Sequence, residues 1–146
     1  MSAMQRFGVI GGGAWGTALA QVLRRAGRGV VLWAREPEVV AAINSDHDNP
    51  LFLPNVALDP AIRATADLAE VARADALLLV APAQHLRTMC KQIEPSLAAS
   101  TPLIICAKGI EEETGALLSE VVAASLPQTA LAVLSGPTFA AEVAKG

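Results

Sequence analysis

Short apolar runs alternate along the chain with segments whose apolar residues recur at helical spacing. The runs are rich in Val, Ile and Leu, which is typical of strands that are covered on both faces of a parallel sheet. They predict five strands, at residues 6–10, 29–34, 75–82, 101–109 and 129–137.

Helices are predicted in the segments between these strands. In residues 84–97, for example, Leu86, Met89, Cys90 and Ile93 fall on one helical face. The other predicted helices cover residues 17–27, 37–44, 66–74, 114–126 and 138–146. Gly27 is expected to cap the first of them at its C-terminus, and the Asp-, Asn- and Pro-rich stretch 45–60 is expected to be a loop. Alternating strands and helices predict one α/β domain over residues 1–146, a doubly wound parallel sheet in three αβα layers.

Composition narrows the class of protein. Apolar residues make up 53% of the 146 residues and charged residues 17%, as expected of a folded chain. Aromatic residues are 3%, the net charge is −3, and no cluster of basic residues exceeds the pair Arg24 and Arg25, which argues against nucleic-acid binding.

The segment 1–7 has no signal peptide and no apolar run could span a bilayer, so we expect a cytoplasmic protein without membrane insertion. Cys90 and Cys106 lie far apart in apolar contexts and are expected to be reduced and buried. No metal site is expected.

A glycine cluster follows the first predicted strand and precedes a helix. Gly11, Gly13 and Gly16 fit the pattern G-x-G-x-x-G in the context that a dinucleotide-binding loop requires. Gly11 would permit the tight turn, Gly13 would let a pyrophosphate approach the backbone, and Gly16 would let the helix pack closely on the strand. The first turn of a helix also attracts anions. The pattern predicts a cofactor phosphate site in a Rossmann-type domain rather than a purely structural turn, and it gives Gly12 no role.

The end of the second predicted strand indicates which cofactor binds. Sites selective for NAD usually place an acidic residue there, where it bonds the ribose 2′-hydroxyl. Here Arg35 comes first and Glu36 follows it. A guanidinium suits a 2′-phosphate, so NADP(H) is expected to be preferred and NAD(H) remains possible. Alternatively, Arg35 is a solvated surface residue and Glu36 caps the following helix.

Later strands also end in polar residues, at the sheet edge where ligands of such folds bind. Lys108 follows the fourth strand and could bind a phosphate or polarise a carbonyl. Thr138 lies after the fifth strand and could contact a ligand, cap the next helix, or do both. Residues 111–113 are three glutamates that we interpret as the acidic flank of the following helix. His85 could serve as a general acid, but it has no partner in the sequence, so a surface position at a helix start is expected, and His47 in the polar loop is a weaker candidate.

Several of these segments together resemble one family. GVIGGGAWGTALA, VVLWAR, FLPN, AKGIEEETG and LSGPTFAAEVAKG match, in order and spacing, the bacterial NAD(P)-dependent glycerol-3-phosphate dehydrogenases. The resemblance covers essentially the whole chain and implies cofactor contacts at Ala14, Trp15, Arg35, Lys108 and Ala140. It implies substrate contacts at Lys108, Gly136 and Thr138. Many members of the family have a serine where this chain has Ala14. The hydroxyl contact to the cofactor phosphate is therefore lost, but the backbone N–H of the residue remains to bind it.

The family interconverts dihydroxyacetone phosphate and sn-glycerol 3-phosphate for phospholipid synthesis, and its full-length members are expected to be homodimers. Its members continue into a second, all-helical domain that carries the lysine expected to act as catalytic acid and base. The resemblance therefore implies that this lysine lies beyond Gly146, that the C-terminal helical domain is missing here, and that residues 1–146 bind cofactor with negligible turnover. Two alternatives stay open: the cofactor domain of another β-hydroxyacid-type dehydrogenase, and a stand-alone nucleotide-binding module.

Overall fold

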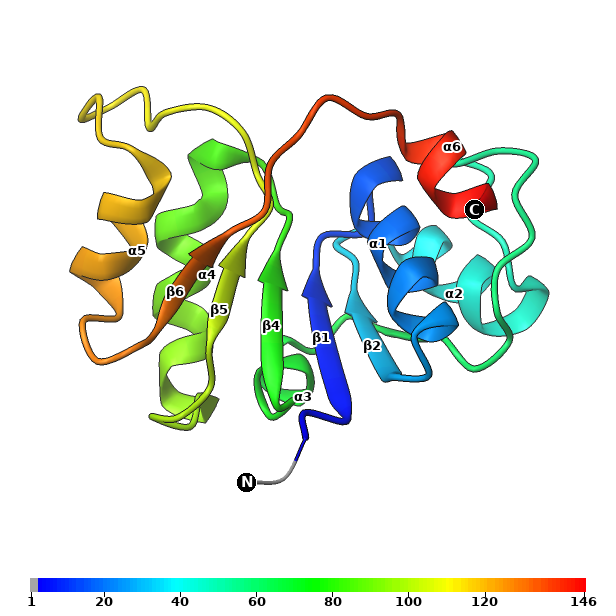
Figure 1. Cartoon of the computed structure of the whole chain (residues 1–146), viewed down its shortest axis with the longest axis horizontal. Coiled ribbons are helices and arrows are strands. Elements are labelled where there is room, and N and C mark those ends of the chain that lie inside the picture. Colours follow the sequence, from blue (N-terminus) through cyan, green and yellow to red (C-terminus); the bar gives the residue numbers. More distant parts are fainter. Residues whose placement is uncertain (1–2) are drawn as a thin grey trace.

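A six-stranded parallel sheet forms the centre of the computed structural model, which describes residues 3–146 (Figure 1). Residues 1 and 2, part of the segment in which no signal peptide is expected, lie outside the described residues. The strand order is β3-β2-β1-β4-β5-β6, the order of a doubly wound Rossmann sheet. The strands are β1 (Arg6–Ile10), β2 (Gly29–Trp33), β3 (Arg63–Thr65), β4 (Ala76–Leu79), β5 (Leu103–Ile105) and β6 (Leu131–Val133).

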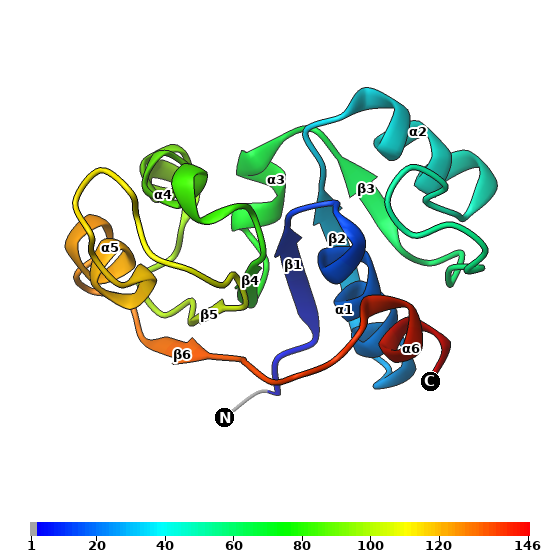
Figure 2. The same cartoon turned by 90° about the horizontal axis from the view of Figure 1, so that it is seen from above.

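Helices cover both faces of this sheet, which confirms the predicted three-layer architecture (Figure 2). One apolar cluster joins α1, α2 and α6 to the sheet, and a second joins α3, α4 and α5 to its other face. The helices are α1 (Ala14–Arg25), α2 (Pro37–Asp46), α3 (Leu68–Ala72), α4 (Leu86–Ile93), α5 (Leu118–Ser125) and α6 (Ala140–Lys145).

The interior follows the apolar pattern closely. Leu86, Cys90 and Ile93 of α4 are fully buried, as their shared helical face predicts. Gly27 has a positive φ of 76° just after α1, which suits a C-terminal cap. Burial of these apolar faces on the sheet is the main stabilising contribution to the fold.

The prediction of five strands is wrong by one. The sixth strand, β3, has only three residues and pairs in parallel with the outer edge of β2, where Leu32 lies opposite Ala64. Its sequence, RAT, is too short and too polar to form an apolar run, although Ala64 and Thr65 are buried in the fold. The loop predicted over residues 45–60 leads into it and is well packed, with Leu53, Val56 and Leu58 buried.

Several predicted helix starts are also wrong. Helix α1 begins at Ala14 and not at residue 17, because its first turn lies inside the glycine motif, and α3 and α4 begin two residues later than predicted. Helix α5 begins at Leu118 and not near residue 114, because residues 110–117 form a closed loop in which Ile110 and Leu117 make an antiparallel bridge. Helix α6 takes Phe139 as its N-cap residue, with no side-chain cap bond, so Thr138 is not the cap. Thr138 lies one residue too early, since the chain stays extended up to Phe139 as it crosses the edge of the sheet (Figure 1).

Candidate functional site

The glycine loop follows β1, which lies between β2 and β4 in the sheet. The strand order reverses at β1, so the loop lies at the switch point of the sheet. Gly11 has a φ of +134°, and an added Cβ there would lie 2.9 Å from the Ala81 nitrogen. An added Cβ at Gly16 would lie 1.8 Å from the Gly11 carbonyl oxygen. At Gly13 an added Cβ would meet nothing within 4 Å, so this position opens onto free space. The geometry is the one expected for a tight turn, a close helix contact and an open approach to the backbone.

Gly12 and the start of α1 complete the loop. A Cβ at Gly12 would lie 2.5 Å from the Ala34 Cβ, so this glycine permits close packing on the segment after β2, a role that the motif does not predict. The first backbone bond of α1 runs from the Thr17 N–H to the Gly13 carbonyl at 3.0 Å, and no side chain caps the helix. The N–H groups of the first turn are therefore available to an anion.

A buried asparagine outside the glycine motif is hydrogen-bonded to this loop. Asn49 is fully buried, and its Nδ2 donates to the Gly12 carbonyl and to the Thr17 Oγ1, each at 2.9 Å. Its Oδ1 accepts a bond from the Phe52 N–H at 3.3 Å. Asn49 could not be identified from the sequence, because one polar residue in a polar stretch carries no signal of burial.

Two adjoining cavities line the carboxyl edge of the sheet. The larger, of about 760 Å³, extends from the glycine loop to Trp33 and Arg35 on one side and to α4 on the other. The smaller, of about 380 Å³, lies between the ends of β4, β5 and β6. Both are lined by Ala14, Trp15 and residues 80–82, so together they form one groove centred on the start of α1. Their volumes fall in the range of cavities that bind cofactors.

Arg35 and Glu36 lie together in the larger cavity. Arg35 is exposed and Glu36 is half-buried, and neither side chain makes a hydrogen bond or ion pair with any residue in the range 3–146. Glu36 is the N-cap residue of α2, but its side chain makes no cap bond. The interpretation of Glu36 as a capping side chain is therefore wrong, since its carboxylate is longer than the Asp, Asn, Ser or Thr side chains that fold back onto a helix start.

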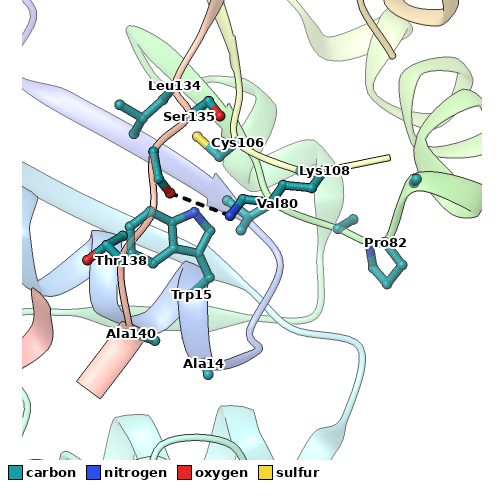
Figure 3. Close-up of a pocket in the computed structure, with 14 residues that line it drawn as sticks. Ala14, Trp15, Val80, Pro82, Cys106, Lys108, Leu134, Ser135, Thr138 and Ala140 are labelled. Atoms are coloured by element: carbon teal, nitrogen blue, oxygen red, sulfur yellow. Dashed lines mark hydrogen bonds between the residues drawn. The ribbon is translucent and has the colours of Figure 1, made fainter. Parts of the chain in front are cut away.

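The smaller cavity contains most of the other predicted site residues (Figure 3). Lys108 follows β5, and its Nζ donates to the Gly136 carbonyl at 3.5 Å. Thr138 lines the same cavity from the extended segment after β6, which crosses the sheet edge to reach α6, and Ala140 lines it as the first residue of α6. The structure thus brings together Lys108, Gly136, Thr138 and Ala140 with Ala14 and Trp15, and it places Arg35 in the other half of the groove.

The chain after Lys108 is fixed to α4 by a salt bridge. Arg87 donates to both carboxylate oxygens of Glu111, at 2.8 and 2.9 Å, and Thr114 donates to the same carboxylate at 2.6 Å. The Arg87 hydrogen bonds, and then that of Thr114, lower the pKa of Glu111 to about 2. Glu111 is therefore a buried, ionised structural residue. The interpretation of residues 111–113 as an acidic helix flank is wrong for Glu111, because its carboxylate turns toward α4.

Histidines and cysteines play smaller parts in the described structure. His85 is exposed on the wall of the larger cavity, and His47, with a φ of 56°, is the C-cap residue of α2. Cys90 and Cys106 are free and buried, and burial raises the pKa of each thiol to about 11. Within residues 3–146 no group of three or more His, Cys, Asp or Glu side chains could hold a metal ion, and no helix of that range could cross a membrane.

The fold and the groove define a dinucleotide-binding domain of the Rossmann class: an open phosphate loop at the switch point of a doubly wound sheet, with polar groups at the later strand ends. Comparison with known proteins identifies the family. The family model described as the NAD-dependent glycerol-3-phosphate dehydrogenase N-terminus matches residues 6–146, and the chain belongs to this family.

Individual relatives agree with the family match. The chain is 62% identical over 143 residues to a glycerol-3-phosphate dehydrogenase [NAD(P)+] of Paramagnetospirillum magneticum, covering 98% of this chain and 52% of the relative. It is 63% identical over 139 residues to that of Rhodospirillum rubrum, covering 94% and 40%. The crystal structure of glycerol-3-phosphate dehydrogenase from Coxiella burnetii superposes with a TM-score of 0.90 at 34% identity, over 97% of this chain and 44% of that one. The chain thus spans about half the length of the relatives it matches.

Proposed function

We propose that residues 1–146 form the cofactor-binding half of a glycerol-3-phosphate dehydrogenase, which interconverts dihydroxyacetone phosphate and sn-glycerol 3-phosphate by hydride transfer. The observation that carries this proposal is the single groove in which the open phosphate loop and the Lys108, Gly136 and Thr138 cluster adjoin. A dinucleotide lying along such a groove would place its reactive ring beside the polar cluster.

The residues present fit a dinucleotide. Gly13 opens onto the groove, the first turn of α1 offers unpaired N–H groups, and Ala14 and Trp15 line both cavities. In this proposal Gly11, Gly13, Gly16 and the backbone N–H of Ala14 form the pyrophosphate site, and Trp15, Lys108 and Ala140 are further cofactor contacts. When bound, the nicotinamide ring supplies or accepts the hydride.

Arg35 and Glu36 form the adenosine end of the proposed site. Arg35 has no partner among the described residues, so its guanidinium can pair with a 2′-phosphate, and we propose NADP(H) as the preferred cofactor. The nearby Glu36 carboxylate would repel that phosphate but could accept a bond from the 2′-hydroxyl of NAD(H). Use of both cofactors follows, in agreement with the names of the relatives.

Lys108 is the proposed contact with the substrate. Its ammonium group is a cation at the end of β5, and Thr138 offers a hydroxyl in the same cavity. A cation there would hold the substrate phosphate or stabilise negative charge that develops on the C2 oxygen. We place the catalytic acid and base, a lysine, in the all-helical half that lies outside residues 1–146.

Calorimetry and kinetics test this function. Residues 1–146 should bind NADPH, and more weakly NADH, with negligible turnover, whereas the full-length protein should oxidise NADPH when dihydroxyacetone phosphate is added. Absence of binding at millimolar cofactor would refute the cofactor site. Turnover by the full-length protein with hydroxyacids instead of dihydroxyacetone phosphate would favour a β-hydroxyacid-type dehydrogenase, and a 146-residue natural product that binds cofactor without any activity would favour a nucleotide-binding module.

We also propose that the full-length protein is a cytoplasmic homodimer. The buried, unpaired thiols are compatible with a reducing compartment. Cell fractionation tests the location, and sedimentation equilibrium of the full-length protein tests the oligomeric state.

A further inference from the structure

Asn49 is a buried polar side chain that connects the loop before β3 to the phosphate loop. It is fully buried, lies 37 residues from Gly12 in sequence, and is held in place at its own turn by the Phe52 N–H. Asn49 is not part of the glycine motif, and the proposed function gives it no role.

The hydrogen bonds of Asn49 fix the direction of one peptide plane. Its amide lies in the interior, so the Gly12 carbonyl that accepts its bond at 2.9 Å also points into the interior. In a trans peptide the carbonyl of one residue and the N–H of the next point in opposite directions. Residues 3–146 contain no cis peptide bond. The Gly13 N–H therefore points away from Asn49, and Gly13 itself lines the larger cavity.

We propose that Asn49 is a positioning residue for the cofactor pyrophosphate: by holding the Gly12 carbonyl inward, it keeps the Gly13 N–H directed into the groove. This inference rests on the proposed function and specifies which group orients the phosphate loop. If the same peptide turned over, it would present a carbonyl oxygen, and therefore a partial negative charge, to the pyrophosphate.

The chemistry of the side chain suits this role. The two hydrogens of Nδ2 bond to Gly12 and Thr17, and Oδ1 accepts from the Phe52 N–H, so each bonding group of the amide has a partner. Aspartate has the same shape but cannot donate to the Gly12 carbonyl, and it would bring a negative charge beneath the phosphate loop. An Asn49→Asp substitution therefore removes the orienting bond with almost no change in volume.

A pair of ligands separates positioning from general loosening of the fold. NADPH carries the pyrophosphate, whereas adenosine 2′-monophosphate carries the 2′-phosphate and adenine but no pyrophosphate. In calorimetry, N49D should lose about 10- to 100-fold in NADPH affinity, the range for a lost bond to a charged group. Its affinity for adenosine 2′-monophosphate should stay within about twofold of the original. Equal losses for both ligands, or no loss for NADPH, would overturn the inference.

Thr17→Val is the matched control. It removes the Thr17 Oγ1, which accepts from Asn49 and itself donates a longer bond of 3.4 Å to the Gly12 carbonyl, but it leaves the 2.9 Å bond from Asn49 to that carbonyl intact. It should lower the midpoint of thermal unfolding while leaving NADPH affinity within about threefold. A loss in T17V as large as that in N49D would overturn the inference, because the Asn49 bond would then have no larger part than the Thr17 hydroxyl in holding the Gly12 carbonyl.

A measurement on the unchanged chain covers the case in which N49D does not fold. In the amide NMR spectrum, NADPH should shift the Gly13 N–H proton and slow its exchange with solvent, whereas adenosine 2′-monophosphate should not. A Gly13 proton that does not respond to bound NADPH would overturn the inference. If the unchanged chain binds neither ligand, the cofactor site itself is wrong, and the inference fails with it.

Discussion

Two glycines test the phosphate loop in different ways. Gly16→Ala should destabilise the fold, whereas Gly13→Ala should weaken NADPH binding. At Gly16, a Cβ would lie 1.8 Å from the Gly11 carbonyl oxygen, whereas carbon and oxygen atoms in contact are seldom closer than 3.0 Å. Gly16→Ala must therefore move α1 away from the loop by roughly 1 Å, and overpacking of this kind costs about 1–3 kcal/mol. We expect about 3 kcal/mol, because both atoms belong to rigid backbone.

At Gly13 the same methyl group has a different effect. Its φ of −73° and ψ of −173° suit alanine, and the added Cβ meets no protein atom within 4 Å. Gly13→Ala should leave the free energy of unfolding unchanged or raise it by about 0.4–1 kcal/mol. Its methyl group would occupy space that the pyrophosphate needs, which should weaken NADPH binding by about 1–3 kcal/mol, or roughly 5- to 150-fold.

Thermal unfolding and calorimetry with NADPH measure the two effects side by side. For a chain of 146 residues, a loss of about 3 kcal/mol lowers the unfolding midpoint by about 6–12 °C. G16A should show this drop, and G13A should unfold at or above the original midpoint while binding NADPH poorly. Unchanged NADPH affinity in G13A would disprove the placement of the pyrophosphate over Gly13, and an unchanged midpoint in G16A would disprove the packing argument.

Further predictions concern the charged residues and the thiols. Arg35→Ala should weaken NADPH binding by about 1.5–3 kcal/mol more than NADH binding in calorimetry, and equal losses would remove the role in reading the 2′-phosphate. Glu36→Gln should strengthen NADPH binding relative to NADH, and the opposite shift in the same assay would show that Glu36 does not face the phosphate. A carbon NMR titration should give Glu111 a pKa near 2, below its ordinary 4.5. The contribution of this carboxylate to stability is then complete above pH 4.5 and is lost as the pH falls through about 2. A titration midpoint at the ordinary value would contradict the hydrogen bonds between Glu111 and Arg87. Cys90 and Cys106 should react with thiol reagents at least about 100-fold faster after unfolding, and rapid reaction of the folded chain would contradict their burial.

Features that depend on local periodicity could be predicted from the sequence. The buried face of α4 follows from Leu86, Cys90 and Ile93, and the phosphate loop follows from glycines in a fixed context. Both features depend on residues that are close together in the chain. The period of the apolar pattern therefore predicts the buried helix face, and the spacing of the glycines predicts the phosphate loop. The apolar runs also predict β5 and β6, but the predicted strands 101–109 and 129–137 extend four residues past the observed ends at Ile105 and Val133.

Features that depend on a distant partner could not be predicted. Glu111 looks like its neighbours in a run of acidic residues, and only the fold shows that Arg87, 24 residues earlier, neutralises it. In the sequence, Asn49 is one polar residue among several in its loop. Only the fold shows that its side chain donates a hydrogen bond to the Gly12 carbonyl. Strand β3 has too few residues for any periodicity, and its pairing with β2 defines it. In each case the information lies in a tertiary contact, which overrides local preference.

The position of α6 has a consequence for how the domain assembles. Arg25 at the end of α1 donates to the Val143 carbonyl at 2.8 Å, across a separation of 118 residues, and also to the Ala144 carbonyl. The groove therefore acquires the wall that contains Ala140 only when α1 and α6, two helices far apart in sequence, come together. Closing so long a loop costs chain entropy, and each doubling of its length adds about 0.6 kcal/mol. A ligand that contacts both Ala14 and Ala140 would favour this closure, because it binds the closed chain alone. Cofactor should thus slow unfolding by holding α1 and α6 together.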